Sequence, residues 1–294
     1  MVFVALCTYN GEKFLSEQLD SILHQSEKVD EIVVCDDQST DNTWKILENY
    51  QKKYPEIIQI HRNNQNLGYV KNFEKAILLC NGDLIFLADQ DDFWFPEKVQ
   101  VVKNELLKNP NKTVICHDLR LSDQPENDQA TYWKKMEFNP RLNNAEILKK
   151  ILLTGNIFPG MSMAITASAK KRFLPFQKID NIIIHDFELM IQSLKNDEFL
   201  QINQVLGMYR VHPQQNIGFN DRKTDNITSN QLYQKFLGIE TIQTLVAKFG
   251  LSADLISDYK KHASEYYERY LQQFSFIRRI WIDFKTKYYY KIKF

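Results

Sequence analysis

Short apolar runs alternate with amphipathic segments over residues 1–118, and this alternation is what most constrains the fold. The apolar runs cover residues 2–7, 31–35, 57–61, 83–88 and 113–117. They have the length and composition of buried strands. The segments between them, residues 12–25, 40–53, 69–80 and 96–108, carry apolar side chains at helical intervals. Strands that alternate with helices in this way predict an α/β fold, with a mostly parallel sheet covered by helices on both faces.

The remainder of the chain is less regular. Residues 122–144 are polar and contain Pro125 and Pro140, so we expect an excursion outside the core. Further elements are predicted as helices at 145–153 and 185–195 and a strand at 161–166, with only helical spacing from Ser229 onward. A boundary near residues 219–226 then separates a domain of residues 1–220, divided at residue 118, from a C-terminal helical region of residues 221–294.

Composition excludes several classes of protein. Lys plus Arg and Asp plus Glu both number 37, so net charge gives no reason to expect nucleic-acid binding. Four cysteines occur without a CxxC pair, which argues against a zinc site or a disulfide framework. Cys7, Cys35 and Cys116 end apolar runs and are expected to be buried thiols in a reducing, cytoplasmic compartment. No run approaches the roughly 20 apolar residues of a membrane span.

Polar segments follow three of the predicted strands. Thr8-Tyr9-Asn10 follows the first, Asp36-Asp37-Gln38-Ser39 the second, and Asp89-Gln90-Asp91-Asp92 the fourth. The carboxyl ends of parallel strands share one edge of a sheet, where ligands of such proteins bind. We therefore expect these segments to meet in one cleft.

Three carboxylates within four residues, at Asp89, Asp91 and Asp92, repel one another unless a positive group joins them. The glycine-rich phosphate loops GxGxxG and GxxxxGK[ST] are absent from the chain. Carboxylates do suit Mg²⁺ or Mn²⁺, which bind one or two of them together with phosphate oxygens. This pattern favours a divalent ion carrying a diphosphate. The alternative is a solvated turn and helix cap before Pro96.

Four blocks carry a resemblance to a known family. CTYNGEKFLSEQLDSILHQ, EIVVCDDQSTDNT, NLGYVKNFEKAI and DLIFLADQDDFW, in this order, resemble family 2 glycosyltransferases, over about residues 1–220. The resemblance implies the GT-A fold, a Rossmann-like α/β fold. The pair His185-Asp186 and the block Tyr209–His212 resemble most the bacterial rhamnosyltransferase-like members.

The resemblance implies roles for residues of the first half. Thr8, Tyr9 and Asn10 would line the base and ribose site, Asp37 would face the base, and Asp36 would order the loop. Lys71 stands where members often carry an arginine near the nucleotide. The DxD element maps onto Asp89 and Asp91, with Gln90 between them in the donor site. Asp91 is the first choice as metal ligand, and Asp89 would bind ribose or the metal.

Two residues of the second half complete the implied site. His212 would be a further metal ligand; the alternative is a histidine on a surface loop. Asp186 would be the general base that deprotonates the acceptor hydroxyl; the alternative is an N-cap aspartate. Arg210 would face the diphosphate or form a structural salt bridge, and Trp94 would stack on a sugar or belong to the core.

The implied activity is inverting transfer of a sugar from a nucleotide-diphosphate sugar, dTDP-rhamnose or a UDP-hexose, to a glycan hydroxyl in bacterial cell-surface polysaccharide synthesis. The implied cofactor is Mn²⁺ or Mg²⁺. One alternative is a nucleotidyltransferase, for which a glycine-rich basic loop near the amino end is expected, whereas Gly11 stands alone. Another is a catalytically silent sugar-nucleotide-binding protein.

The C-terminal segment FSFIRRIWIDFKTKYYYKIKF interleaves basic and aromatic residues. Segments of this kind lie on anionic membrane surfaces, which suits a lipid-linked glycan acceptor and the inner face of the plasma membrane. The alternative is a terminal helix that packs on its own domain or on a second copy of the chain in a homo-oligomer.

Overall fold

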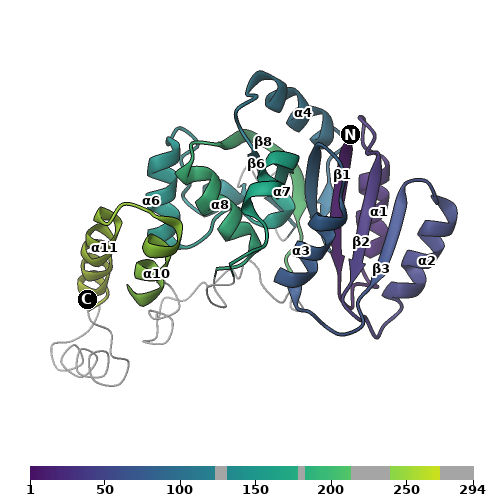
Figure 1. Cartoon of the computed structure of the whole chain (residues 1–294), viewed down its shortest axis with the longest axis horizontal. Coiled ribbons are helices and arrows are strands. Elements are labelled where there is room, and N and C mark those ends of the chain that lie inside the picture. Colours follow the sequence, from purple (N-terminus) through teal and green to yellow (C-terminus); the bar gives the residue numbers. More distant parts are fainter. Residues whose placement is uncertain (123–130, 178–182, 213–238, 272–294) are drawn as a thin grey trace. The chain divides into compact units, whose positions relative to one another are not determined.

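The computed structural model describes residues 1–122, 131–177, 183–212 and 239–271 and contains a mixed sheet flanked by helices (Figure 1). Among these residues the sheet has eight strands in the order β3-β2-β1-β4-β7-β6-β8-β5. The strands are β1 (Val2–Thr8), β2 (Glu31–Asp36), β3 (Ile58–Arg62), β4 (Leu84–Asp89), β5 (Phe93–Trp94), β6 (Val114–Leu121), β7 (Met163–Thr166) and β8 (Phe199–Tyr209).

Strand direction is parallel in the half of the sheet nearest the amino terminus. β1 pairs in parallel with β2 and β4, and β2 with β3, and every residue of β1 is buried. Farther along, β6 and β8 are also parallel, whereas β7 runs antiparallel to β4 and β6, and β5 antiparallel to β8. The predicted α/β class with a mostly parallel sheet is confirmed. The antiparallel pairs were not expected.

The predicted helices are present, with starts that differ by up to three residues. They are α1 (Leu15–Leu23), α2 (Thr43–Lys53), α3 (Tyr69–Leu79), α4 (Lys98–Lys108), α6 (Asn144–Thr154) and α8 (His185–Lys195). α3 packs on β1 and β2, and α8 packs on β6 and β8. α5 (Tyr132–Lys135) and α7 (Ala167–Phe173) were not predicted, and neither was β8. β8 carries apolar residues without strict alternation, interrupted by Gln201, Asn203 and Gln204, so its sequence does not show a strand pattern. Its pairing with β6 is interrupted by register shifts on both sides of Asp118.

Aromatic packing makes one prediction wrong. The segment 122–144 was expected to lie outside the core, yet Trp133 and Phe138 are buried. Their ring centroids lie 4.9 Å apart. The ring centroid of Phe158 lies 5.1 Å from that of Phe138 and 5.1 Å from that of Phe199. Apolar burial by two large rings outweighs the polar character of their neighbours. Residues 123–130 of this segment lie outside the described part of the chain.

The chain divides into two compact units, of which the first contains the whole sheet. The second contains α6 (Asn144–Thr154), α10 (Ile239–Phe249) and α11 (Asp254–Leu271). Within it, Ile242 and Leu245 of α10 are buried, and Lys149 pairs with Asp258 at 2.7 Å. The C-terminal region is thus helical where it is described. The predicted boundary at 219–226 and the basic aromatic tail lie outside the described residues.

Two expectations from composition can be compared with the structure. Cys7, Cys35, Cys80 and Cys116 are free and buried, as predicted for the three that end apolar runs. Among the described residues, no helix combines the length and the apolarity that crossing a bilayer requires.

Parallel pairing brings the polar segments to one edge of the sheet. In the register of β1, Thr8 lies opposite Asp36 at the end of β2, and Cys7 lies opposite Asp89 at the end of β4. The segments that follow these strands therefore emerge side by side. This edge carries the cavity described next.

Candidate functional site

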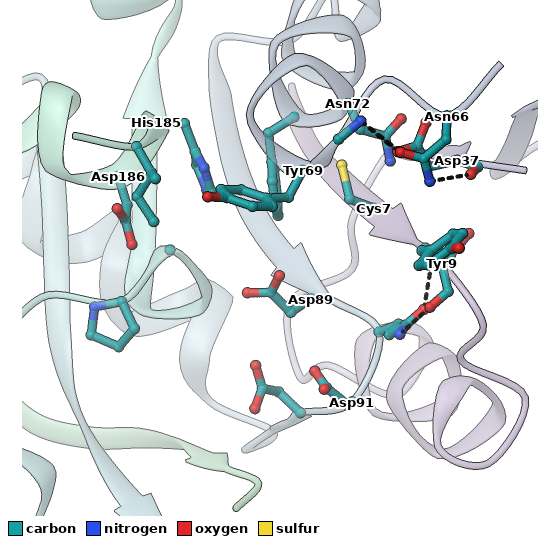
Figure 2. A pocket seen from close by; sticks show the side chains of 18 of the residues that line it. Cys7, Tyr9, Asp37, Asn66, Tyr69, Asn72, Asp89, Asp91, His185 and Asp186 are labelled. Carbon is teal, nitrogen blue, oxygen red and sulfur yellow. Dashed lines mark hydrogen bonds between the residues drawn. The ribbon is translucent and has the colours of Figure 1, made fainter. Parts of the chain in front are cut away.

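A cavity of about 620 Å³ opens at the carboxyl edge of β1, β2 and β4 (Figure 2). Its walls come from the ends of these strands, the start of α3, the 3₁₀ turn Gly160–Ser162 and the start of α8, all within the first unit. The lining residues are Cys7, Thr8, Tyr9, Asp37, Asn66, Gly68, Tyr69, Asn72, Phe73, Asp89, Gln90, Asp91, Asp92, Pro159, Gly160, Ile184, His185, Asp186 and Tyr209.

Most of the residues singled out in the sequence meet in this cavity. Those that line it are Thr8, Tyr9, Asp37, Asp89, Gln90, Asp91 and Asp186. In the view of Figure 2, Asp186 and Tyr9 lie on opposite sides, with Asp89 between them. Asn10 and Lys71 are not among the lining residues, and His212 reaches the site through its contact with Asp91.

The acidic segment after β4 places three carboxyl groups on the cavity wall. The pKa of Asp89 is raised to about 8, mainly by burial and also by the charges of Asp91 and Asp186, whereas Lys98 opposes this rise. Burial is also the main cause that raises the pKa of Asp92, which accepts a hydrogen bond from the backbone N–H of Arg210 at 3.0 Å. Clustered carboxyl groups of this kind bind a cation more readily than they bind an anion.

His212 stands next to this cluster, at the end of β8. Its Nε2 lies 2.9 Å from Oδ2 of Asp91, and both side chains are mostly buried. In the described ranges, no set of three His, Cys, Asp or Glu side chains is arranged to hold a metal ion by itself. A carboxylate oxygen and an imidazole nitrogen nevertheless fit Mn²⁺, which takes its remaining ligands from phosphate and water. The donor set therefore fits a divalent ion that arrives together with a diphosphate.

Asp37 organises the loop that precedes α3. Its Oδ1 accepts hydrogen bonds from the backbone N–H of Leu67 and from Asn63, both at 2.7 Å, and its Oδ2 accepts one from the N–H of Gly68 at 2.9 Å. Gly68 has φ 76°, a conformation that favours glycine. Asp37 thus lines the cavity, but both its oxygens already bind protein N–H groups. Asn66 of the same loop and Tyr69 at the start of α3 were not predicted and also line the cavity.

Asp36 orders the turn after β2. It is fully buried and accepts hydrogen bonds from the hydroxyls of Thr8, at 2.9 Å, and Ser39. Asn10 joins the same turn from the other side, since its Oδ1 accepts the N–H of Thr40 at 2.8 Å. These contacts join the loops after β1 and β2 into one wall.

Gln90 joins the acidic segment to the loop after β1. Its Oε1 accepts the backbone N–H of Tyr9 at 2.8 Å, and its Nε2 donates to the carbonyl of Tyr9 at 2.9 Å. A Cβ atom on Gly11 would lie only 2.1 Å from Oε1 of Gln90. A side chain at position 11 would therefore force the Gln90 side chain to shift.

The basic side chains near the site do not line the cavity. Lys71 pairs with Glu74 at 2.6 Å. Arg210 donates to Glu17 at 2.8 Å and to the carbonyl of Asp91 at 2.8 Å, which agrees with the salt-bridge interpretation. The described lining residues include five aspartates, at positions 37, 89, 91, 92 and 186, and neither lysine nor arginine.

Asp186 lies in the first turn of α8. The N-cap of this helix is Ile184, so the interpretation of Asp186 as an N-cap residue is wrong. Its Oδ1 accepts the N–H of Phe187 at 2.6 Å. The neighbouring His185 packs its ring on Phe73, with centroids 4.2 Å apart, and burial lowers its pKa to about 3, so its imidazole is neutral. The charge at this wall of the cavity therefore comes from Asp186.

The structure decides the position of two aromatic residues, Trp94 and Tyr69. Trp94 is 1% exposed and packs on Phe86 with ring centroids 5.4 Å apart, so it belongs to the core and does not stack on a sugar. No functional role was predicted from the sequence for Tyr69, which follows Gly68. In the structure its side chain extends from α3 into the cavity (Figure 2). Burial and the charge of Asp186 raise the pKa of its hydroxyl.

Comparisons with known proteins agree with this geometry. The family model described as Glycosyl transferase family 2 matches residues 3–173. The chain is 25% identical over 280 residues to an uncharacterized glycosyltransferase of Nostoc sp. strain PCC 7120, covering 91% of this chain and 83% of that one. It is 43% identical over 99 residues to the dTDP-rhamnosyl transferase RfbG of Shigella flexneri, covering 32% of this chain but only 34% of the relative.

Solved structures share the fold. TarS of S. aureus, residues 1–349 in complex with UDP-GlcNAc, matches with a TM-score of 0.61 at 16% identity, over 89% of this chain and 72% of that one. The mannosyltransferase PcManGT of Pyrobaculum calidifontis, in complex with GDP-Man and Mn²⁺, matches with a TM-score of 0.55 at 18% identity, over 72% and 57%. The matched family range stops before Asp186 and His212, so their roles depend on their positions in the structure.

Proposed function

The chain belongs to glycosyltransferase family 2 and has the GT-A fold, and from this membership we propose that it is a metal-dependent, inverting glycosyltransferase. The donor is a nucleotide-diphosphate sugar and the acceptor is a hydroxyl of a glycan. The observation that carries this proposal is the charge of the cavity, whose described lining residues include five aspartates and no cationic side chain of lysine or arginine.

Electrostatics explains why this lining implies a divalent ion. A diphosphate and a set of carboxylates repel each other strongly in a partly buried site, where the effective dielectric constant is well below that of water. A divalent ion between them reverses the sign of the interaction. Asp91 and His212 would hold this ion, with Asp89 either at the ribose or as a further ligand. When bound, the ion stabilises negative charge on the departing diphosphate.

Asp186 is proposed as the general base. It lies across the cavity from Tyr9 and the nucleotide end, and one of its oxygens is held by the N–H of Phe187. Asp186 takes the proton of the acceptor hydroxyl while that oxygen attacks the anomeric carbon. Attack opposite the departing diphosphate inverts the configuration. General-base assistance of this kind contributes about 10²- to 10⁴-fold.

The nucleotide end of the donor would bind between Thr8, Tyr9, Asp37 and Asn66. For the donor itself we propose dTDP-rhamnose or a UDP-hexose. The likeness to RfbG supports the first, but it covers only 99 residues. Lys71, paired with Glu74, and Asn10, bonded to Thr40, would act on the donor only indirectly.

The acceptor is proposed to be a glycan, or a lipid-linked glycan, of a bacterial cell-surface polysaccharide. The basic and aromatic residues after Phe274 support contact with an anionic membrane at its cytoplasmic face. A second copy of the chain is the alternative partner for this segment. Membership of the family disfavours a nucleotidyltransferase. The experiment below distinguishes an active glycosyltransferase from a catalytically silent sugar-nucleotide-binding protein.

Thermal shift with a panel of nucleotide sugars tests the proposal. Ligands that bind the native state raise its apparent stability. We expect one dTDP- or UDP-sugar to raise the melting temperature in the presence of Mn²⁺ and to lose this effect in EDTA. The same sugar nucleotide should be hydrolysed or transferred slowly in the presence of Mn²⁺. Equal shifts with Mn²⁺ and with EDTA contradict the metal, and binding without turnover on any acceptor or water supports the silent alternative.

A further inference from the structure

Arg210 connects three separate parts of the first unit. Its backbone N–H donates to Oδ1 of Asp92 at 3.0 Å, and its Nε donates to the carbonyl of Asp91 at 2.8 Å. Its Nη2 donates to Oε2 of Glu17 on α1 at 2.8 Å. The guanidinium also lies over the ring of Phe14, 4.5 Å from the ring centroid. The arginine thus joins the end of β8, the acidic segment after β4 and the start of α1.

The same part of α1 also supports His212. The rings of Phe14 and His212 have centroids 5.0 Å apart, and Nε2 of His212 lies 2.9 Å from Asp91. Neither Phe14 nor Glu17 lines the cavity, and Glu17 is half-exposed. The pair Asp91–His212 is therefore held from outside the cavity, through Arg210 and Phe14.

Stability alone does not explain this arrangement. The ion pair joins a mostly buried guanidinium to the half-exposed carboxylate of Glu17, and ion pairs at a protein surface stabilise a protein by only about 0–1 kcal/mol. Arginine differs from lysine here because its planar group donates in two directions at once, to the Asp91 carbonyl and to Glu17. Groups that orient metal ligands from behind typically change metal affinity by roughly 10- to 100-fold when they are removed.

We propose that Arg210 is a positioning residue for the metal site, that Glu17 acts through it, and that Phe14 supports both Arg210 and the His212 ring. Together they hold the Asp91 backbone and the His212 ring at the separation that accepts a divalent ion. This inference depends on the proposed function, since it takes Asp91 and His212 as the metal ligands. It assigns to Arg210 an indirect role, in place of direct contact with the diphosphate.

The test measures Mn²⁺ affinity by titration calorimetry of the full chain at a fixed, saturating concentration of UDP or dTDP, whichever the unmodified protein binds. The variants are Glu17→Ala and Arg210→Lys. The matched control is Glu105→Ala, which removes the partner of Lys108, another exposed ion pair, on α4. We expect Glu17→Ala and Arg210→Lys to weaken Mn²⁺ binding by roughly tenfold, the lower end of the range for such groups. Turnover of Glu17→Ala should recover at saturating Mn²⁺, and Glu105→Ala should match the unmodified protein.

The alternatives give different results. If Arg210 contacts the diphosphate, Arg210→Lys loses nucleotide affinity at every Mn²⁺ concentration, whereas Glu17→Ala behaves normally. If the contacts serve only stability, the melting temperature falls without a change in Mn²⁺ affinity. Either result overturns the inference. If the unmodified protein itself shows no Mn²⁺-dependent nucleotide binding, the proposed function fails, and that outcome is distinguishable because it needs no variant. Glu17→Ala tests the inference even if Arg210→Lys does not fold.

Discussion

Nε2 of His212 lies 2.9 Å from Oδ2 of Asp91, although 121 positions separate the two residues in the chain. β4 brings Asp91 to the edge of the cavity, and β8 brings His212 to the same place from a different part of the sheet. The bond between the backbone of Arg210 and Asp92 fixes the two segments together. A carboxylate and an imidazole in this relation form the start of a divalent-ion site.

Replacing Asp186 by Asn should remove the base and leave the donor site intact. We expect kcat for sugar transfer to fall by about 10²- to 10⁴-fold, because the asparagine amide cannot take the proton from the acceptor hydroxyl. Donor affinity, measured by calorimetry, should stay within about twofold, since Asp186 acts on the acceptor. Asp197→Asn, at an exposed turn after α8, is the control. Near-normal turnover of Asp186→Asn would remove Asp186 from this role.

Removing Asp91 should abolish the contribution of the metal to donor binding. In Asp91→Ala we expect the affinity for the nucleotide sugar to be the same with Mn²⁺ and with EDTA, because the carboxylate that faces His212 is missing. Calorimetric titrations in both conditions provide the measurement. A Mn²⁺-dependent increase in affinity that equals that of the unmodified protein would show that the ion binds elsewhere.

Gly11→Ala should destabilise the site through Gln90. The new Cβ would lie 2.1 Å from Oε1 of Gln90, so the bonds between Gln90 and the backbone of Tyr9 must shift. We expect a loss of about 1–3 kcal/mol in the free energy of unfolding, measured by urea denaturation. Combining Gly11→Ala with Gln90→Ala removes the clash. The double variant should therefore lose less stability than the sum of the losses measured for the two single variants. Full additivity would mean that the clash relaxes in another way.

Without metal, the protein should become less stable as the pH rises. The pKa of Asp89 is raised to about 8, mainly by burial, so between about pH 4 and pH 8 the folded state holds a proton that the unfolded state has lost. Stability from this group is therefore present at low pH and is lost as the pH rises through about 8, by less than about 1.4 kcal/mol per unit. Urea denaturation in EDTA at pH 5.5 to 8.5 measures the slope, and Asp89→Asn should flatten it. A slope of the opposite sign, or an unchanged slope in Asp89→Asn, contradicts this assignment.

The basic aromatic tail should bind anionic membranes. We expect the full chain to sediment with vesicles that contain phosphatidylserine, and a chain that ends at Phe274 to remain in the supernatant. Vesicles of phosphatidylcholine alone are the control. If both chains behave alike, the tail has a different partner, and a change in oligomeric state on truncation would identify a second copy of the chain.

The local sequence pattern was sufficient to predict most helices and strands of the first half and the residues that gather at one edge of the sheet. Alternating apolar runs and helical intervals record which side of each element is buried, so β1 to β4 and the helices between them were predicted to within about three residues. Because parallel strands end at a shared edge, the sequence also placed Thr8, Asp37, Asp89 and Asp91 in one cavity.

The tertiary structure alone decided which segments that lie far apart in the chain contact one another. Sequence periodicity did not reveal β8 or the burial of Trp133, and it left the position of Trp94 open, because these depend on partners supplied by other elements. From the sequence, Arg210 could face a phosphate or an acidic side chain, and only the packed structure shows Glu17 on α1 as its partner. A sequence by itself determines the local periodicity of each element, whereas the choice of partner among distant groups is made only when the core packs.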